Sequence, residues 1–212
     1  MKLLVPAIIV LSLLANSNSG SQVRIGVQGG LNFGTITTSE QIPAYTNWQG
    51  RTNIAFSALA SIALNPELAI QFEPRYIKKG IRISWSVGLN PTDVTETLSY
   101  LEIPILLRYS LPVFQSQPFV FAGPSLDLLL SATEEGTFFG YPHAPIDVKP
   151  NYNPNDLSFE FGAGWELPLV ADLSVLPSIR YELGLKNIYE VPETSRHTHG
   201  IQLTVAVVFL SI

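Results

Sequence analysis

The chain has no cysteine, few charged residues and only five lysines among its 212 residues. The absence of cysteine excludes a disulfide scaffold and a thiolate-bound metal. Charged residues make up 14% of the chain, whereas an ordinary soluble domain carries about 25%. The net charge of −5 excludes a generic nucleic-acid binder. With a mean hydropathy of +0.25, this composition indicates either a large buried core or an outer surface that faces lipid.

Long apolar runs are also missing after residue 22, and no segment keeps the 3.6-residue period of an amphipathic helix. The one apolar run, residues 3–15, follows Met1-Lys2 and precedes a small polar stretch. This layout is typical of a secretory signal peptide. A retained membrane anchor is the alternative, but a spanning helix needs about 20 residues. We therefore predict a signal peptide over residues 1–21.

Strict alternation of apolar and polar residues, which is typical of β-strands with one apolar face, recurs in residues 23–35, 157–169, 173–185 and 201–209. Four further segments fit this pattern less cleanly. The eight predicted strands cover residues 23–35, 52–64, 67–79, 95–111, 118–133, 157–169, 173–185 and 201–209. Their connections alternate between short turns and the long segments 36–51, 80–94, 134–156 and 186–200. Short turns at one end and long loops at the other indicate an eight-stranded antiparallel up-and-down transmembrane β-barrel over residues 22–212.

The volume of the barrel interior indicates which face of each strand points inward. A soluble lipocalin-like barrel would also alternate, with its apolar side chains inside. The interior of eight strands is only just wide enough for side chains, and the apolar faces would overfill it with Phe33, Phe72, Tyr76, Phe159, Phe161, Trp165, Tyr181 and Phe209. A lumen charge network is therefore predicted from Arg24, Glu73, Arg75, Glu102, Arg108, Asp127, Glu160, Glu166, Arg180, Glu182 and Lys186.

Prolines conflict with this assignment at five positions within or near the predicted strands: Pro74, Pro104, Pro124, Pro168 and Pro177. A proline removes a hydrogen bond from the ladder, and a closed barrel has no edge strand where that loss is harmless. Bulges and strand ends accommodate some of them, but neither explains Pro104 in the middle of its strand.

Five blocks of sequence resemble the PorT-type outer-membrane β-barrel proteins of Bacteroidetes. They are GVQGGLNF at 26–33, YLEIPILLRY at 100–109, PFVFAGPSL at 118–126, FGAGW at 161–165 and YELGLKNI at 181–188. The resemblance implies an exported eight-stranded barrel and offers a precedent for prolines within strands. Some members of that family are associated with protein secretion, which leaves a secretion-associated barrel component as one alternative for function.

Few residues suggest chemistry. His197 and His199 would share a face of a strand, but no third metal ligand is evident. An enzymatic barrel would need a nucleophile and a base near one another, for which His143 with Ser131 is the best pair. The glycines between residues 26 and 34 precede no helix and do not form a phosphate loop. We expect no catalytic residues, no metal and no cofactor.

The sequence therefore predicts a non-enzymatic outer-membrane barrel with a lumen closed by paired charges and long extracellular loops for interaction or envelope support. Its expected partners are outer-membrane lipid and an envelope or extracellular protein bound through loop 134–156, with no nucleic acid. A soluble exported lipocalin-like binding barrel and a small conducting pore are the alternatives.

Overall fold

The computed structural model describes residues 22–41, 43, 45–87, 90–113, 117–170, 172–191 and 194–211. The predicted signal peptide lies outside these residues. The elements are β1 (Val23–Thr38), β2 (Asn47–Ala63), β3 (Leu68–Phe72), β4 (Arg75–Val87), β5 (Asn90–Ser110), β6 (Gln117–Phe138), β7 (Tyr141–Asp147), the 3-10 turn η1 (Lys149–Asn151), β8 (Asn155–Val170), β9 (Leu173–Gly184) and β10 (Arg196–Ser211). No helix among the described residues has the length and apolar character needed to cross a bilayer.

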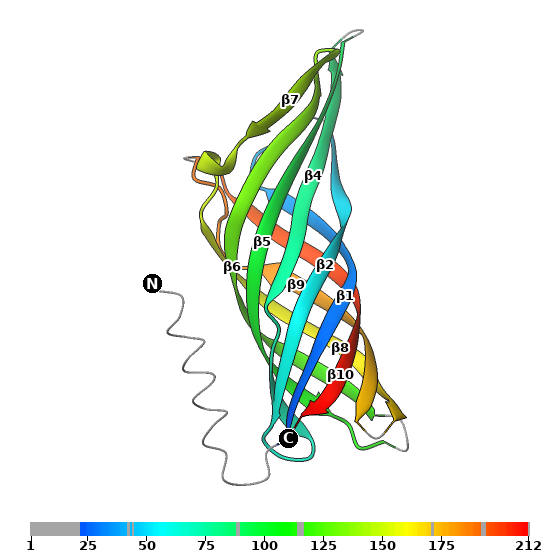
Figure 1. Ribbon diagram of the computed structural model, residues 1–212. Coiled ribbons are helices and arrows are strands. Elements are labelled where there is room, and N and C mark those ends of the chain that lie inside the picture. Colours follow the sequence, from blue (N-terminus) through cyan, green and yellow to red (C-terminus); the bar gives the residue numbers. More distant parts are fainter. Residues whose placement is uncertain are drawn as a thin grey trace.

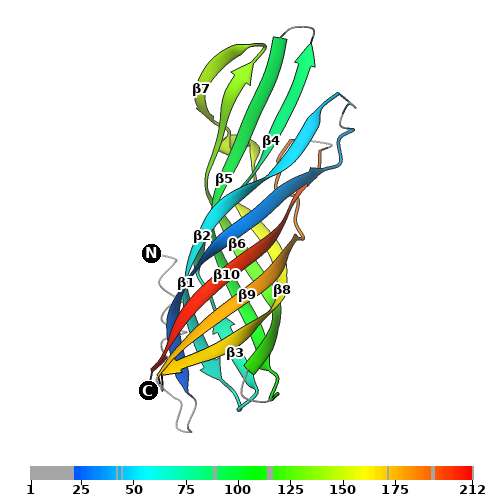
Figure 2. The same cartoon turned by 90° about the vertical axis from the view of Figure 1, so that its right-hand side faces the viewer.

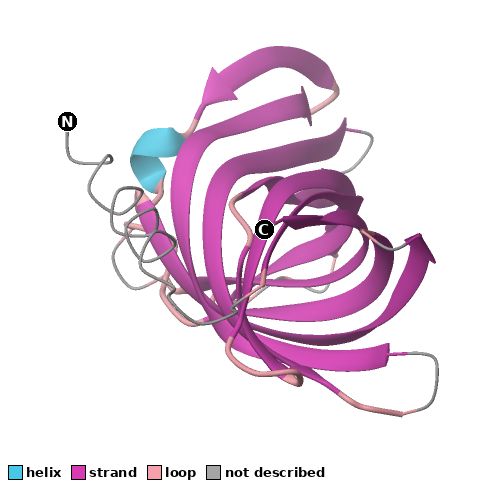
Figure 3. Cartoon of the chain, turned by 60° about the horizontal axis from the view of Figure 1, so that its bottom comes forward, coloured by secondary structure: helices cyan, strands magenta, loops and turns pink. Residues whose placement is uncertain are grey.

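The strands form a closed ring in which all pairings are antiparallel. The first strand, β1, pairs with β2 on one side and with the last strand, β10, on the other. The ring runs β1, β2, β3 with β4, β5, β6, β8, β9 and β10. Figure 1 shows the strands inclined around a long axis, and Figures 2 and 3 show the same ring from the side and towards one end. The prediction of an eight-stranded up-and-down barrel is confirmed.

One strand of the ring is interrupted at Glu73-Pro74, which divides it into β3 and β4. The register with β5 is the same on both sides of the interruption, since Phe72 pairs with Ile105 and Arg75 with Glu102. Pro104 stands opposite the interruption, and its carbonyl accepts a hydrogen bond from the Glu73 N–H. Pro104 therefore lacks its donor where the ladder is already broken, which explains a proline in the middle of a barrel strand.

The strands extend farther than predicted at the end of the barrel with the long connections, called here the long-strand end. The predicted loop 80–94 is a continuous β4–β5 hairpin, and loop 134–156 contains the end of β6, β7 and η1. The segments 36–51 and 186–200 are likewise shortened, because β1, β2 and β10 each extend into them. Figure 1 shows β4, β5, β6 and β7 projecting beyond the rest of the ring. The rule for a membrane-spanning strand fails there because the two faces exchange polarity: Ile81 and Val94 are buried on the inner face, whereas Arg82 is exposed on the outer face.

Side chains on the outer face of the ring form an apolar belt. Its members are exposed apolar residues that include Ile25, Phe33, Phe56, Tyr76, Ile105, Leu130, Phe161, Trp165, Leu185, Ile201 and Phe209. The core lies inside the ring and combines buried charged groups with two apolar clusters. This is the outward-apolar arrangement of a transmembrane barrel rather than the inward-apolar arrangement of a lipocalin.

Candidate functional site: the charged barrel interior

Ten of the eleven predicted lumen residues lie on the inner face of the ring. Nine of them are buried: Glu73, Arg75, Glu102, Arg108, Asp127, Glu160, Glu166, Arg180 and Glu182. Arg24 is partly buried and binds Glu166. The assignment of Lys186 to the lumen is wrong, because its exposed side chain lies past the end of β9 and donates to the Asn155 carbonyl.

Two arginines hold three carboxylates in the middle of the barrel. Arg75 Nη2 lies 2.5 Å from Glu102 Oε2 and also binds Glu160. Arg180 Nη1 lies 3.0 Å from Glu160 Oε2 and 2.7 Å from Glu73 Oε2. Glu160 thus joins the two arginines. These side chains come from β4, β5, β8, β9 and the β3–β4 interruption, so the ion pairs connect opposite walls of the ring.

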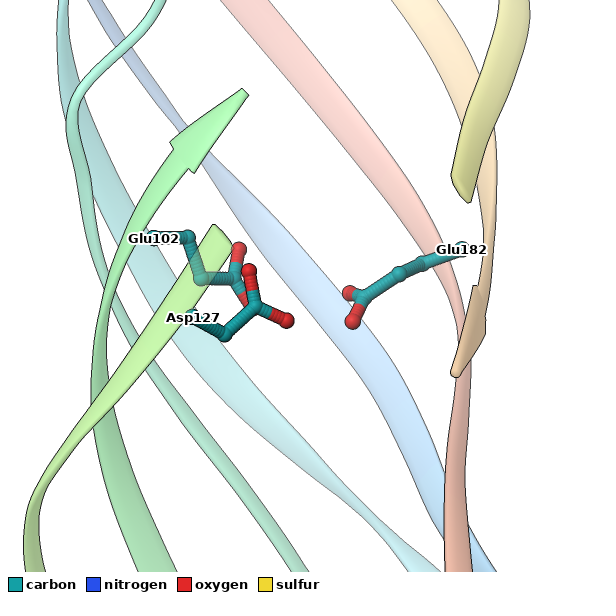
Figure 4. Close-up of side chains that lie close together, drawn as sticks. All are labelled: Glu102, Asp127 and Glu182. Carbon is teal, nitrogen blue, oxygen red and sulfur yellow. The ribbon is translucent and has the colours of Figure 1, made fainter. Parts of the chain in front are cut away.

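Lys79 lies at the centre of a second group of carboxylates. Its Nζ is 2.6 Å from Glu102 Oε1 and 3.3 Å from Asp127 Oδ2, and it also binds Glu182. Figure 4 shows Glu102 and Asp127 on neighbouring strands and Glu182 reaching towards them from across the interior. Three acidic groups so close together resemble a metal site, but the ammonium of Lys79 already occupies the cation position among them.

A separate ion-pair group lies in the interior near the end with the short connections, called here the short-turn end. Arg24 donates from both terminal nitrogens to Glu166, at 2.9 and 2.6 Å. Arg108 Nη2 donates to the same carboxylate at 2.6 Å. These residues line a cavity of about 720 Å³ that opens at this end.

Apolar clusters lie on both sides of the central charges. Along β5 the inward side chains begin with Leu98 and Tyr100 of the upper apolar cluster, continue with Glu102, and end with Leu106 of the lower apolar cluster before Arg108. The upper cluster comprises Ile36, Ala55, Ile77, Ile81, Leu98, Tyr100, Leu129, Ala132, Tyr152 and Ile188. The lower cluster comprises Leu59, Leu106, Phe119, Phe121, Leu176, Ala206 and Val208. The charged groups in the middle are thereby separated from both ends.

Arg196 anchors the connections that cover the long-strand end. It lies over the ring of Tyr189 at 4.1 Å, and its Nη1 lies 3.2 Å from both Glu96 Oε2 and the Tyr152 hydroxyl. Burial, reinforced by the Glu96 carboxylate, raises the pKa of Tyr152 above its usual range. Burial alone would lower the pKa of Arg196, but Glu96 raises it. Burial and Glu96 therefore keep the tyrosine neutral, although Arg196 acts in the opposite direction, and Glu96 with the two tyrosines keeps the arginine charged.

The sequence reasoning missed several members of the interior, above all Lys79. A signal for Lys79 was present, because it shares the odd-numbered face of its predicted strand with Glu73 and Arg75. Glu96 lies at the edge of a predicted strand, while Arg196 and Asp156 lie in segments predicted as loops. Exchanging Lys186 for Lys79 leaves five cations and six carboxylates in the network, and the buried Asp156 adds a seventh carboxylate.

The other candidate sites remain separate residues on the outer surface. His197 and His199 share the outer face of β10, where each bonds to a hydroxyl side chain. His143 pairs with Gly136, whereas Ser131 pairs with Ser99 lower on the same sheet. The structure therefore does not bring the proposed nucleophile and base together.

Residues 14–190 match the family model described as outer membrane protein beta-barrel domain. The chain belongs to this family. It is an outer-membrane β-barrel, as the closed ring and the apolar belt indicate. None of the curated protein sequences matches it.

Solved structures with a similar fold are also outer-membrane proteins. A major outer membrane protein of Thermus thermophilus has a TM-score of 0.56 and 9% identity, and the alignment covers 91% of this barrel and 100% of that chain. The outer membrane protease OmpT of Escherichia coli has a TM-score of 0.53 and 7% identity, with coverages of 92% and 99%. OprG of Pseudomonas aeruginosa has a TM-score of 0.50 and 9% identity, with coverages of 90% and 97%. At these identities the likeness concerns the fold of the barrel.

Proposed function

We propose that this barrel is a non-enzymatic membrane anchor whose lumen is closed by its charge network. The observation that carries the proposal is the burial of the central charges: Glu73, Glu102, Asp127 and Glu160 each have 0% exposed surface. A water-filled pore would leave room for water beside such groups. The ion pairs, with an apolar cluster on either side of them, support a lumen without a continuous hydrated path along the axis.

The projecting sheet of β4, β5, β6 and β7 is the part of the barrel that such an anchor would display. Exposed aromatic side chains gather near its tip, where the rings of Phe138 and Phe139 meet edge to face. Tyr141 beside them is 78% exposed. Exposed aromatic residues are frequent in protein interfaces. This region lies within the predicted partner-binding segment 134–156, so we assign contact with an envelope or extracellular protein to this tip.

The short connections at the short-turn end support a periplasmic position for this end, because short turns are periplasmic in other barrels of this kind. The projecting sheet would then lie outside the cell, after removal of residues 1–21. The chain has no cysteine, so a single introduced thiol reports its own position. Ser86→Cys near the hairpin tip should react with an impermeant maleimide on intact cells, whereas Asn65→Cys should react only after lysis. The reverse pattern would overturn this orientation.

Conductance tests the proposed closure of the lumen directly. The purified barrel, folded into planar bilayers, should show no stepwise ion current. A gel of boiled and unboiled samples, in which folded barrels migrate differently until heated, verifies that the protein is folded. Regular current steps from folded protein would overturn the proposed closure.

Within its family, we propose that the barrel is of the PorT type. The five sequence blocks that suggest this lie on β1, β5, β6, β8 and β9, including the connection after β9. They are distributed around the ring rather than confined to one hairpin. A role in protein secretion has no support from any residue described above.

A further inference from the structure

The cavity at the short-turn end has the size of a binding pocket and ends inside the barrel. Its volume is about 720 Å³, within the range of about 300–1,000 Å³ that is usual for pockets that bind small molecules. Arg24, Arg108 and Glu166 line it, whereas no described residue of the lower apolar cluster does. The guanidinium of Arg108 lies 4.0 Å from the ring centroid of Phe119, which belongs to that cluster. A molecule that enters this pocket therefore reaches the arginines and stops below the apolar cluster.

Two arginines share one carboxylate in this pocket. Both terminal nitrogens of Arg24 donate to Glu166, and Arg108 Nη2 donates to the same carboxylate at 2.6 Å. The three side chains thus combine two positive charges with one negative charge. The group in the middle of the barrel has the opposite imbalance, because carboxylates outnumber cations there. The pocket consequently holds one positive charge that lacks a counter-charge.

The acidic residues at the mouth of the pocket do not neutralise this charge. Glu67 accepts a hydrogen bond from the Tyr109 hydroxyl at 3.4 Å, and Tyr109 belongs to the outer face of the ring. Asp172 is exposed in the turn between β8 and β9. Within the described part of the chain, neither carboxylate lies within 4.0 Å of a nitrogen of Arg24 or Arg108.

Arg108 has donors that the barrel itself does not use. Its side chain is 5% exposed, and it is one of the residues that line the pocket. Among the described residues only its Nη2 finds an acceptor, while Nε is buried without one. Leaving a buried donor unpaired costs free energy. An acceptor on another molecule would relieve that cost and supply the missing negative charge.

A carboxylate is the anion that best matches this pocket. Guanidinium groups bind planar carboxylates through paired N–H groups, as Arg24 already does with Glu166. One carboxylate would bring the local charge to zero, whereas a phosphate monoester, with nearly two charges at neutral pH, would leave a partly buried negative charge. Ser61, Gln117 and Ser174 also line the pocket, and their hydroxyl and amide groups can pair with amide groups of the same ligand.

We propose that this pocket binds small molecules that carry a single carboxylate beside amide groups, which is the chemistry of a peptide carboxy terminus. Arg108 and Arg24 would bind the carboxylate. This activity goes beyond that of a membrane anchor, and it needs no open lumen because the pocket ends at the lower apolar cluster. In the orientation proposed above the ligand would come from the periplasm, but binding to the purified barrel does not depend on that orientation.

The test uses N-acetyl-alanyl-alanine as the probe and its carboxy-terminal amide as the matched control, with binding to the detergent-folded barrel measured by calorimetry. The free carboxylate should bind at least about tenfold more tightly than the amide, because hydrogen bonds to charged groups are the stronger ones. Inorganic phosphate at the same concentration should not displace the probe. Equal binding of acid and amide would overturn the proposal, and displacement by phosphate would overturn the assignment to a carboxylate.

Two variants change the affinity in opposite directions. Arg108→Gln removes the unpaired donors and should weaken binding of the probe at least about tenfold. Glu166→Gln removes the competing carboxylate but keeps both arginines, so it should strengthen binding about tenfold. Lys186→Gln removes a cation at the opposite end of the barrel and should leave binding unchanged.

The gel migration of unboiled samples establishes that each variant is folded. Unchanged or weaker binding by folded Glu166→Gln would overturn the proposal, since a merely structural ion pair gives no reason for tighter binding. This result decides the matter even where Arg108→Gln does not fold. An equal loss of affinity in Lys186→Gln and Arg108→Gln would also refute the site, because it would show that only the overall charge of the barrel attracts the probe.

Discussion

Lys78 and Lys79 are consecutive residues on opposite faces of β4, and they provide a matched pair of substitutions. Lys79 is 2% exposed among three carboxylates, whereas Lys78 is exposed on the outer face. Methionine keeps most of the side-chain length and removes the charge. Lys79→Met should lower the free energy of unfolding by about 3–5 kcal/mol, because it leaves buried carboxylates without their cation. Lys78→Met should change it by less than about 0.5 kcal/mol.

Urea unfolding in zwitterionic vesicles, monitored by the fluorescence of the three tryptophans, measures the difference. With an m-value of about 2 kcal/mol per molar urea, a loss of about 4 kcal/mol lowers the midpoint by about 2 M. A double variant that also carries Glu182→Gln removes one of the stranded carboxylates. It should therefore recover part of the loss, with a coupling of about 0.5–3 kcal/mol.

Similar midpoints for the two single variants would refute the reasoning, because they would show that Lys79 is as hydrated as Lys78. The unboiled gel migration of each variant establishes first that the barrel is folded. A loss in Lys79→Met that Glu182→Gln does not relieve at all would place the cause in packing rather than in charge.

Four further substitutions test other parts of the structure by the same unfolding measurement. Glu102→Leu should cost about 3–5 kcal/mol, because it removes a buried carboxylate that Arg75 and Lys79 share, and an unchanged midpoint would show that these cations are hydrated. Gly123→Ala should cost about 1–3 kcal/mol, because its Cβ would fall on a backbone carbonyl oxygen of β5. Gly29→Ala is the control and should be close to neutral, because the nearest atoms to its Cβ lie at 3.7 Å. Equal effects of the two substitutions would contradict the packing argument. Burial and a neighbouring carboxylate raise the pKa of Glu134 above 4.5, so its contribution to stability is present below pH 4.5 and is lost as the pH rises through the raised value. Glu134→Gln should therefore be stabilising relative to the unmodified barrel at pH 7 but not at pH 4, and the same difference at both values would show that the carboxyl group is not perturbed.

The barrel itself could be predicted from sequence because each membrane-spanning strand repeats one physical constraint. Its outer side chains meet lipid and its inner side chains meet a narrow interior, so apolar and polar residues must alternate. Lys186 was misassigned because the inward direction of the even-numbered side chains was extended past Gly184, where β9 ends. Beyond the end of a strand, an even or odd residue number no longer predicts the direction of the side chain.

The projecting sheet could not be predicted in this way. Residues such as Thr92, Thr95 and Thr97 favour strands, but the apolar face of this sheet is the inner one, where Ile81 is buried, and not the outer one as in a membrane-spanning strand. The position of Pro104 depends on the interruption between β3 and β4, which is a property of two strands together. The partners of Lys79 come from β5, β6 and β9, and only the closed ring brings them within reach of one ammonium.

The pairing of β1 with β10 makes assembly depend on the whole chain. Val23 lies opposite Ser211 and Thr38 opposite Arg196. The first strand therefore has both of its neighbouring strands only after the last strand has been synthesised. A partly synthesised chain would present two unpaired edges, which attract other strands and favour aggregation. Contacts so distant in sequence also form slowly. We therefore expect insertion to occur after synthesis is complete, with the nascent chain kept apart from its own copies until closure.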